Sequence, residues 1–442
     1  MNVKIIPSNG LKGEIIAPGS KSYSHRAFIA ASLAEGISTI NNPLTSGDVK
    51  VTMDMLETLG INIIRKSSNI YIVQNSKGFL ENISQILDCK NSGTSIRIFS
   101  ALSLLIKGGL SFRGEFLIKS RPILPLLEAL TQLGVKYNLS TNLLHIKRAK
   151  KICQDIKIRG DISSQFITAL LMICPLLKCE TKDYINIEIT SPITSYPFID
   201  ITLEILSSFG IDIQEQLDEN KLGTYKIQLN QKYRAQTFEI PGDFSSIAFI
   251  IAGAIISPEN SKVIIKNLDF KKPQGDKKII KILQQMGARI EVDIDQNRII
   301  VSGNLNQYPL KGINIDCRDI PDLFPILSII AAFADDKTIL YNASTLRLKE
   351  SDRISVVARE LKKMGVKVIE GKDKLTIFHC KKLRGSVIDH NNDHRIALAF
   401  SIGALYANSN SQINNVDVVE DSFPDFIRIL RSLGAKIQEI NK

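Results

Sequence analysis

The sequence predicts an α/β protein of two domains, each built from three repeated βαβαββ-like units. Six times, a helical run ends in Leu-x-x-Leu-Gly or a close variant and passes directly into an alternating strand. Upstream of each copy, a polar turn opens another amphipathic helix. Two related segments, Ala17-Pro18-Gly19-Ser20 and Ile240-Pro241-Gly242-Asp243, each precede three copies, which divides the chain into halves.

The glycine of each copy suits the residue just after a helix, where a left-handed backbone costs glycine least. Successive glycines lie 69–78 residues apart by subtraction, whereas solenoid repeats usually have about 20–45 residues. Closed globular domains are therefore favoured over a six-unit solenoid. We expect one domain at 19–239 and the other at 1–18 plus 240–442, with the strands at 4–6 and 14–16 joining the second because no glycine phrase precedes them. The six glycines are Gly60, Gly134, Gly210, Gly287, Gly365 and Gly434.

The second helix of each unit opens with residues that suit helix N-caps, namely Ser, Asp, Asn and Gly. The apolar stretches that follow these turns predict buried helices. The turns lie at 18–25, 91–95, 160–165, 241–246, 318–322 and 391–395.

Composition restricts the class of protein. The 442 residues, 44% hydrophobic and 23% charged, suit a globular protein with two sizeable cores. The longest apolar run, 247–256, is too short to span a bilayer, and no secretory leader is evident. The six cysteines show no metal-ligand spacing, so a reducing, cytoplasmic setting without metal is expected. The net charge of +11 is compatible with nucleic acid, an anionic membrane or acidic small substrates, although a generally basic, Lys-rich surface accounts for much of it.

Cations gather at or near the predicted helix starts, where free N–H groups already favour anions. If these turns face one cleft, it would suit a ligand with several negative charges, and Asp322 and Glu350 would be available for proton transfer. Each turn alone also has an ordinary structural interpretation, such as a capping serine or a solvated charged face. The cations are Lys21, Arg26, Arg97, Arg121, Lys349, Arg353 and Arg395.

Local spacing gives further expectations for these residues. Pro122 suits the first position of a helix, which would put Arg121 at its N-cap. Lys349 and Arg353 are four residues apart and would share a helix face. Asp393 could be either the partner of Arg395 or a helix cap, and Asp322 could be a cap or a functional carboxylate.

The motifs PGSKSYSHR, NSGTSIR, GDISSQF, SPITSYPFID, IPDLFPI, LRLKESDRI and NDHRIALAF occur together and in family order. With them, the chain resembles the EPSP synthase family of enolpyruvyl transferases over nearly its whole length. The resemblance implies an inverse α/β barrel fold with two domains that close over the substrates. It implies transfer of the enolpyruvyl group of phosphoenolpyruvate to the 5-hydroxyl of shikimate 3-phosphate, in the shikimate pathway to chorismate and aromatic amino acids. No metal or organic cofactor, no nucleic acid and no membrane is implied, and a monomer is expected.

The resemblance also assigns roles to residues. Lys21, Asp322 and Glu350 would be catalytic. The expected contacts of shikimate 3-phosphate are Lys21, Ser22, Arg26, Ser163, Ser164, Gln165, Ser195, Asp322 and Lys349. The expected contacts of phosphoenolpyruvate are Lys21, Gly93, Arg121, Arg353, His394 and Arg395.

Some positions depart from the family pattern. Phe198 stands where relatives often have Tyr, Ile98 where many have Pro, and Asp421 where many have Lys. Two alternatives remain. A related transferase acts on UDP-N-acetylglucosamine and carries a reactive cysteine in the loop just before the residue that matches Arg121. In this chain the corresponding stretch, 112–120, contains no cysteine. The other is a basic, repeat-built nucleic-acid-binding protein.

Overall fold

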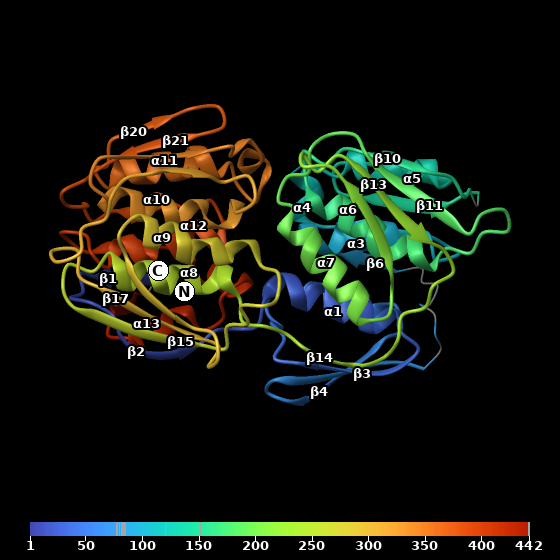
Figure 1. Ribbon diagram of the computed structural model, residues 1–442, viewed down its shortest axis with the longest axis horizontal. Helices are drawn as coiled ribbons and strands as arrows, with labels where there is room; N and C mark the ends of the chain where they lie inside the picture. The colour runs from blue at the N-terminus through green and yellow to red at the C-terminus, as the bar shows by residue number, and fades with distance from the viewer. Residues whose placement is uncertain (77, 79, 81–84, 120, 151, 441–442) are drawn as a thin grey trace. The chain divides into compact units, whose positions relative to one another are not determined.

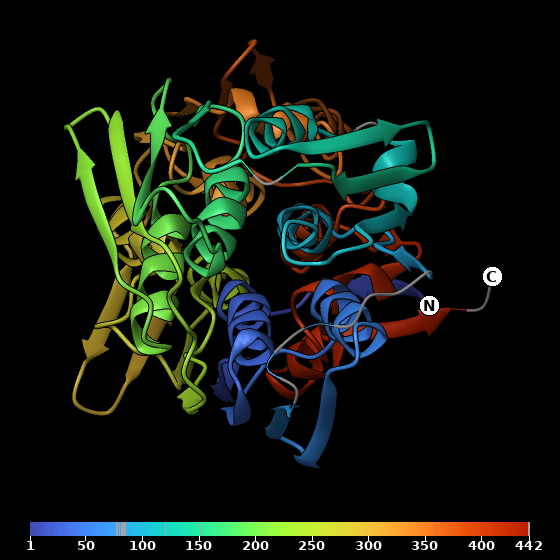
Figure 2. The ribbon, with the colours of Figure 1, turned by 90° about the vertical axis from the view of Figure 1, so that its right-hand side faces the viewer.

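The computed structural model describes residues 1–76, 78, 80, 85–119, 121–150 and 152–440. Its contacts divide the chain into two compact units, drawn in Figures 1 and 2. We call Lys21–Ile240 the continuous unit, and Met1–Ser20 with Pro241–Lys442 the discontinuous unit. Each unit has its own cluster of buried apolar side chains. The chain therefore forms two separate hydrophobic cores.

The continuous unit contains three four-stranded sheets, with strand orders β14-β3-β5-β4, β6-β7-β9-β8 and β10-β11-β13-β12. Its strands are β3 (Gly36–Asn41), β4 (Asn62–Ser67), β5 (Ile70–Asn75), β6 (Ile86–Asp88), β7 (Leu110–Arg113), β8 (Val135–Leu139), β9 (Leu144–Arg148), β10 (Ile156–Ile158), β11 (Tyr184–Ile189), β12 (Ile213–Leu217), β13 (Gly223–Gln228) and β14 (Thr237–Glu239). Its helices are α1 (Lys21–Leu33), α2 (Gly47–Thr58), α3 (Gly93–Leu102), α4 (Glu115–Ile118), α5 (Leu124–Gln132), α6 (Ser164–Ile173), the 3-10 helix η1 (Cys174–Leu176) and α7 (Pro197–Ser208).

The discontinuous unit repeats this plan, with strand orders β16-β17-β15-β2, β18-β19-β21-β20 and β22-β23-β1-β24. Its strands are β1 (Asn2–Ile6), β2 (Lys12–Ile16), β15 (Ser261–Lys266), β16 (Arg289–Asp293), β17 (Arg298–Gly303), β18 (Asn314–Asp316), β19 (Lys337–Tyr341), β20 (Val368–Glu370), β21 (Leu375–Phe378), β22 (Val387–Ile388), β23 (Ser411–Ile413) and β24 (Lys436–Ile440). Its helices are α8 (Phe244–Ile255), η2 (Gly275–Lys277), α9 (Lys278–Gln285), η3 (Pro321–Leu323), α10 (Phe324–Phe333), η4 (Ser344–Leu348), α11 (Arg353–Lys363), α12 (His394–Ala404), η5 (Val416–Asp421) and α13 (Phe426–Ser432).

All six sheets share one pairing pattern. Each begins with a parallel pair, such as β6 with β7, and continues with two antiparallel pairings, such as β7 with β9 and β9 with β8. The six glycines of the recurring phrase all have positive φ, from 81° to 104°. Both findings confirm the predicted α/β class and its six repeated units. The first two strands, β1 and β2, lie in sheets of the discontinuous unit.

The helices that follow the polar turns form the interior of each unit. Helices α8 and α12 are buried along their whole lengths, and α1, α3, α6 and α10 are buried over most of theirs. A helix that is apolar all round needs neighbours on every side. In the view of Figure 2, the strands of the continuous unit lie around its helices. No helix in the described ranges is both long and apolar enough to cross a membrane.

The chain passes between the units at two neighbouring points. Ser20 N–H donates to the Pro241 carbonyl at 2.8 Å, and Asp243 N–H donates to the Pro18 carbonyl at 2.9 Å. The strands next to these points pair with strands that are distant in the sequence. Strand β2 pairs in parallel with β15 of the discontinuous unit, while β14 pairs in parallel with β3 of the continuous unit.

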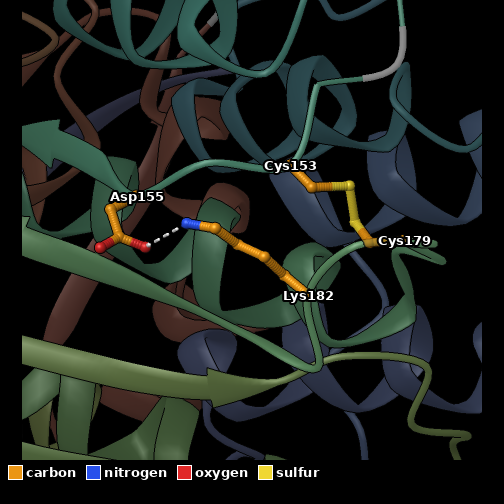
Figure 3. The surroundings of a disulfide bond; sticks show 4 residues. All are labelled: Cys153, Asp155, Cys179 and Lys182. Carbon is orange, nitrogen blue, oxygen red and sulfur yellow. Dashed lines mark ion pairs between the residues drawn. A yellow bond between two sulfur atoms is a disulfide. The ribbon is translucent and has the colours of Figure 1, made fainter.

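The cysteines depart in one respect from the expected reducing setting. Cys153 and Cys179 form a disulfide with a Cα–Cα distance of 6.1 Å (Figure 3). Their segments lie on either side of β10 and α6, and the fold brings the two cysteines to a separation that suits a disulfide. Sequence spacing gave no sign of this pairing. Cys89, Cys174 and Cys317 are buried thiols, as expected from their apolar surroundings.

Candidate active site

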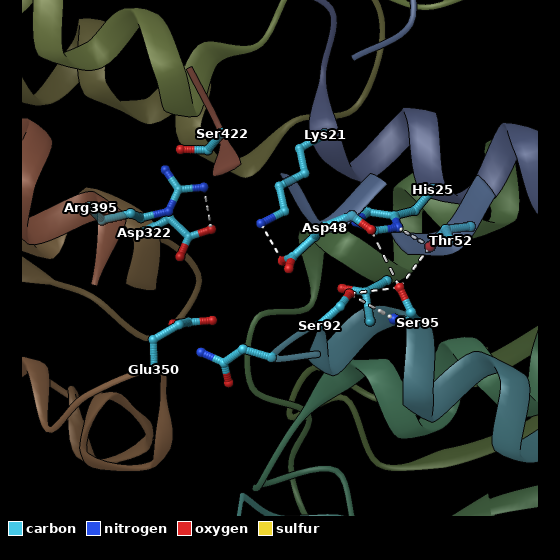
Figure 4. A network of polar contacts seen from close by, with 12 residues as sticks. Lys21, His25, Asp48, Thr52, Ser92, Ser95, Asp322, Glu350, Arg395 and Ser422 are labelled. Atoms are coloured by element: carbon cyan, nitrogen blue, oxygen red, sulfur yellow. Dashed lines mark hydrogen bonds and ion pairs between the residues drawn. The ribbon is translucent and has the colours of Figure 1, made fainter. Parts of the chain in front are cut away.

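In the continuous unit, side-chain hydrogen bonds connect the N-terminal parts of α1, α3 and α6, and Thr52 of α2 is the bridge between α1 and α3. His25 Nδ1 lies 2.7 Å from Thr52 Oγ1, which lies 2.7 Å from Ser95 Oγ (Figure 4). Gln165 Nε2 donates to Thr94 Oγ1 at 3.0 Å. Because His25, Thr94, Ser95 and Gln165 lie near helix starts, these bonds bring three polar turns together.

Hydroxyl groups cap two of these helices. The Ser92 side chain accepts a hydrogen bond from Ser95 N–H, and the Ser163 side chain accepts one from Gln165 N–H. These caps confirm the predicted helix starts. Ser195, just before α7, is another predicted site residue, and it is buried with φ of 56°. A left-handed backbone is uncommon outside glycine, and such residues cluster at functional sites.

The cations of this unit are held by neighbouring groups. Lys21 is the first residue of α1, and its Nζ lies 2.6 Å from an Asp48 carboxylate oxygen (Figure 4). Arg121 Nη1 donates to the Asn91 carbonyl at 2.7 Å, and its guanidinium lies over the Phe116 ring. The expected helix cap at Arg121 is wrong, because α5 begins only at Leu124. Arg121 instead lies in the connection between α4 and α5.

Arg26 is almost fully buried, with 2% of its surface exposed. Its Nη1 donates to the carbonyl of Ser22 at 2.9 Å, and its Nη2 to the carbonyl of Phe198 at 3.2 Å. Its Nε donates to Thr202 Oγ1 at 2.8 Å. Direct contact with a ligand would require some of these bonds to open. In this structure Arg26 supports the turn that carries Ser22.

Gly93, the first residue of α3, lies where a side chain would crowd the cations. A Cβ atom there would lie 3.0 Å from Arg97 Nη1 and 3.2 Å from Arg121 Nη2. Arg97 is itself engaged, since its Nη1 donates to Gln165 Oε1 at 2.6 Å. Glycine therefore keeps the space beside both guanidinium groups open.

In the discontinuous unit, Arg353 is the centre of a buried charge cluster. Its side chain is 1% exposed, and each of its nitrogens lies 2.9 Å from a different carboxylate. These carboxylates belong to Asp322, Glu350 and Asp393. Burial alone lowers the pKa of Arg353, but the carboxylates outweigh burial and hold it well above its ordinary value. Arg353 therefore stays charged.

Asp322 joins Arg353 to a second buried guanidinium, that of Arg395. Arg395 Nη2 lies 3.0 Å from Asp322 Oδ2, and the Arg395 side chain is 5% exposed (Figure 4). Burial alone raises the pKa of Asp322, but Arg395, Arg353 and Lys349 hold it well below its ordinary range. Asp322 is consequently an ionised carboxylate between two guanidinium groups.

Several local expectations for this cluster are settled by the structure. Lys349 and Glu350 precede α11, which begins at Arg353, so the expected shared helix face of Lys349 and Arg353 is wrong. Asp393 caps α12 by accepting from Arg395 N–H, and its carboxylate also pairs with Arg353. Asp322 makes no side-chain cap and lies in η3 before α10.

The predicted site residues are divided between the two units. The continuous unit carries Lys21, Ser22, Arg26, Gly93, Arg121, Ser163, Ser164, Gln165 and Ser195, and the discontinuous unit carries Asp322, Lys349, Glu350, Arg353, His394 and Arg395.

Sequence reasoning missed three buried or partly buried titratable groups beside these residues. Asp48 pairs with Lys21, and His25 belongs to the hydroxyl chain of the continuous unit. Asp276 is 3% exposed, and its pKa is raised by the charge of Asp322 and lowered by that of Arg395. Asp48 and Asp276 each follow a glycine near a helix start. A Gly-Asp pair at such a position was the available signal.

Comparison with known proteins gives a consistent result. The family described as EPSP synthase (3-phosphoshikimate 1-carboxyvinyltransferase) matches residues 5–430. The 3-phosphoshikimate 1-carboxyvinyltransferase of Methanocaldococcus jannaschii is 42% identical over 434 residues, covering 97% of each chain. That of Methanococcus maripaludis is 39% identical over 435 residues, covering 97% of this chain and 98% of the relative. The solved EPSP synthase of Acinetobacter baumannii superposes with a TM-score of 0.79 at 26% identity, covering 99% of each chain.

Proposed function

The chain belongs to the EPSP synthase family, and from this premise we propose that it transfers the enolpyruvyl group of phosphoenolpyruvate to the 5-hydroxyl of shikimate 3-phosphate. The products would be 5-enolpyruvylshikimate 3-phosphate and inorganic phosphate. The observation that carries the proposal is the cluster of Asp322, Glu350, Arg353 and Arg395, in which the guanidinium groups are buried and the two carboxylates are partly exposed. It combines two carboxylates for proton transfer with two guanidinium groups for an anion.

We assign phosphoenolpyruvate to Arg353, Arg395 and His394 of the discontinuous unit and to Lys21, Gly93 and Arg121 of the continuous unit. A planar guanidinium can donate two parallel hydrogen bonds to a carboxylate or phosphate, which suits both acidic groups of this substrate. The free space beside Gly93 supports the assignment, because it lies next to two guanidinium groups.

We assign shikimate 3-phosphate to the hydroxyl-rich helix starts of the continuous unit. Ser163 and Ser164 open α6, where free backbone N–H groups favour a phosphate. Ser22 and Arg26 belong to the start of α1, where the buried Arg26 side chain donates to the carbonyl of Ser22. The other proposed contacts are Lys21, Gln165, Ser195, Asp322 and Lys349.

Proton transfer would use the two carboxylates in turn. Glu350 donates a proton to the methylene carbon of phosphoenolpyruvate, which makes its C2 electrophilic. The 5-hydroxyl oxygen then bonds to C2, and its proton passes to Asp322. An anion beside Arg353 would weaken that guanidinium's hold on Glu350 and so favour a proton there. Loss of phosphate from the tetrahedral adduct, with the proton on Asp322 passing to the departing phosphate and a C3 proton returning to Glu350, restores the double bond and both carboxyl groups.

The proposal is tested by phosphate release with both substrates and with each omitted in turn. Phosphate should appear only in the complete mixture. The same assay with UDP-N-acetylglucosamine in place of shikimate 3-phosphate tests the related activity, and release from that mixture alone would contradict our proposal. We also propose a cytoplasmic monomer with no nucleic-acid partner. Gel filtration tests the monomer, and salt-dependent duplex binding would contradict the absence of nucleic acid.

A further inference from the structure

The Cys153–Cys179 disulfide lies at the start of the strand pair β10–β11 (Figure 3). Cys153 comes shortly before β10 and Cys179 shortly before β11, and these two strands pair in parallel. Parallel partners begin at the same end of a sheet, so the disulfide joins the two segments where both strands begin. Both cysteines are partly exposed, as access by a small thiol requires.

Strand β10 is weakly anchored by hydrogen bonds alone. It has three residues and lies at the edge of its sheet, beside β11. Asp155, just before it, accepts from Asn186 N–H at 3.1 Å and from Asn186 Nδ2 at 3.0 Å. Lys182 Nζ lies 3.7 Å from the same carboxylate (Figure 3). The disulfide therefore adds a covalent link at a place where the ladder between strands is short.

The other end of the same strand pair leads into the turn at 160–165, where Ser163 caps α6. Gly160 N–H and Asp161 N–H donate to Ser191 Oγ at 3.0 and 3.3 Å, so this turn is bonded to the turn that follows β11. A strand extends about 3.3 Å per residue, so roughly 10 Å of β10 separates its start from the turn. A shift of β10 against β11 therefore moves residues that we assign to shikimate 3-phosphate.

Two cations lie beside the disulfide. Arg148, the last residue of β9, and Lys178 line a small hollow together with Cys153 and Cys179. Within the ranges that the structure describes, neither cation has an ion pair or a side-chain hydrogen bond. A cation beside a cysteine stabilises its thiolate, which is the form that leaves in thiol–disulfide exchange. The surroundings therefore favour opening of this disulfide by a thiol.

We propose that Cys153–Cys179 is a redox site at which a dithiol releases the start of β10 and loosens the turn at 160–165. Its effect on shikimate 3-phosphate rests on the proposed function. In a reducing compartment, disulfides are usually transient or redox-sensing, so the cytoplasmic setting proposed above agrees with a site that opens and closes.

The exchange proceeds in two steps. One thiolate of the dithiol bonds to one cysteine sulfur, the protein S–S bond breaks, and the other cysteine leaves as a thiolate that takes up a proton. The second thiol of the reagent loses its proton and bonds to the reagent sulfur of this mixed disulfide, which releases the first cysteine to take up a proton. The protein gains two electrons and two protons, and the dithiol, now a cyclic disulfide, loses them.

The first experiment counts thiols and measures amide hydrogen exchange without any substrate. Alkylation after denaturation should find four thiols in the oxidised protein and six after treatment with dithiothreitol. Exchange at 156–165 should then be about tenfold faster or more, while β5, in another sheet, should keep its rates. The melting temperature of the continuous unit should fall by about 4–16 °C.

Two outcomes would overturn the inference. The first is a thiol count that stays at four under dithiothreitol or at six under its oxidised form. The second is unchanged exchange at 156–165 when the count does change. The double variant Cys153→Ser/Cys179→Ser should show the fast exchange with and without dithiothreitol. The matched control Cys380→Ser, at a partly exposed free thiol of the discontinuous unit, should respond as wild type does.

The second experiment measures binding of shikimate 3-phosphate alone by calorimetry. Reduction should raise its Kd about two- to tenfold, the usual effect of ordering one more side chain on binding, and reoxidation should restore it. An equal Kd in both states would overturn control of the binding turn. Absence of binding in both states would contradict the proposed function instead, and the exchange measurement would still decide whether the disulfide holds β10.

Discussion

Replacement of Arg353 by methionine should strongly destabilise the discontinuous unit. Arg353 is 1% exposed, and it holds three carboxylates, one of which, Asp393, is fully buried. Removing one member of a buried ion pair usually costs about 3–5 kcal/mol, because the partner charge remains buried. A loss of 1 kcal/mol lowers the melting temperature by about 2–4 °C in units of roughly 150–250 residues. Arg353→Met should therefore lower the melting temperature of this unit by about 6–20 °C.

The assay is thermal unfolding followed by far-ultraviolet circular dichroism, since the chain contains no tryptophan. The matched control is Arg428→Met, which breaks an Arg–Asp pair of the same 2.9 Å length whose arginine is 76% exposed. An exposed pair contributes little to stability, so this control should move the transition far less than Arg353→Met does. The difference between Arg353→Met and wild type should narrow at pH 5, where the orphaned carboxylates can take up protons. Equal shifts for the two variants, or a gap that widens at pH 5, would refute the reasoning.

Three further predictions concern single residues. Glu350→Gln should lower kcat by about 10²–10⁴-fold with KM nearly unchanged, because it removes the proposed acid but keeps its shape; near-normal turnover in a stopped-flow phosphate assay would exclude that role. Gly93→Ala should raise KM for phosphoenolpyruvate more than it lowers kcat, because its Cβ would lie 3.0 Å from Arg97 Nη1 and 3.2 Å from Arg121 Nη2, and an unchanged KM would show that these groups move aside freely. Burial lowers the pKa of His25 to about 3; the Asp48 carboxylate opposes this shift, and the charges of Lys21 and Arg26 add to it. Below pH 6.5 the unfolded chain therefore binds one more proton than the folded chain does. The stability of the continuous unit should consequently fall as the pH drops from 6.5 toward 3. His25→Gln should remove about 2–3 kcal/mol of this loss of unfolding free energy at pH 4.5, measured by urea unfolding at pH 6.5 and at pH 4.5. The same loss in the variant as in wild type would contradict the low pKa of His25.

Sequence reasoning reached the repeated units because their signals are local. A glycine with positive φ follows each helix at the predicted positions, and Ser92 and Ser163 cap the predicted helices. Each of these features depends on a few neighbouring residues, so a short motif is enough to predict it.

Partnerships within the candidate site could not be predicted in the same way. Asp322 and Asp393 are 31 and 40 residues from Arg353, and no short spacing records that they meet. Local spacing even misled for Lys349, because the helix starts four residues later at Arg353. The Cys153–Cys179 disulfide has the same origin, since only the folded chain brings these cysteines together. Long-range pairing depends on tertiary packing, which a single sequence does not display.

The position of β1 has a consequence for synthesis of the chain. This strand, Asn2–Ile6, lies between β23 and β24, so it pairs with segments that are synthesised long after it. The continuous unit, by contrast, occupies one stretch that is complete when Ile240 emerges. Non-local strand pairing waits until both partners exist. During translation, β1 therefore remains without its strand partners while the continuous unit, about half the chain, is synthesised and folds. The unpaired strand is consequently a candidate for protection by chaperones.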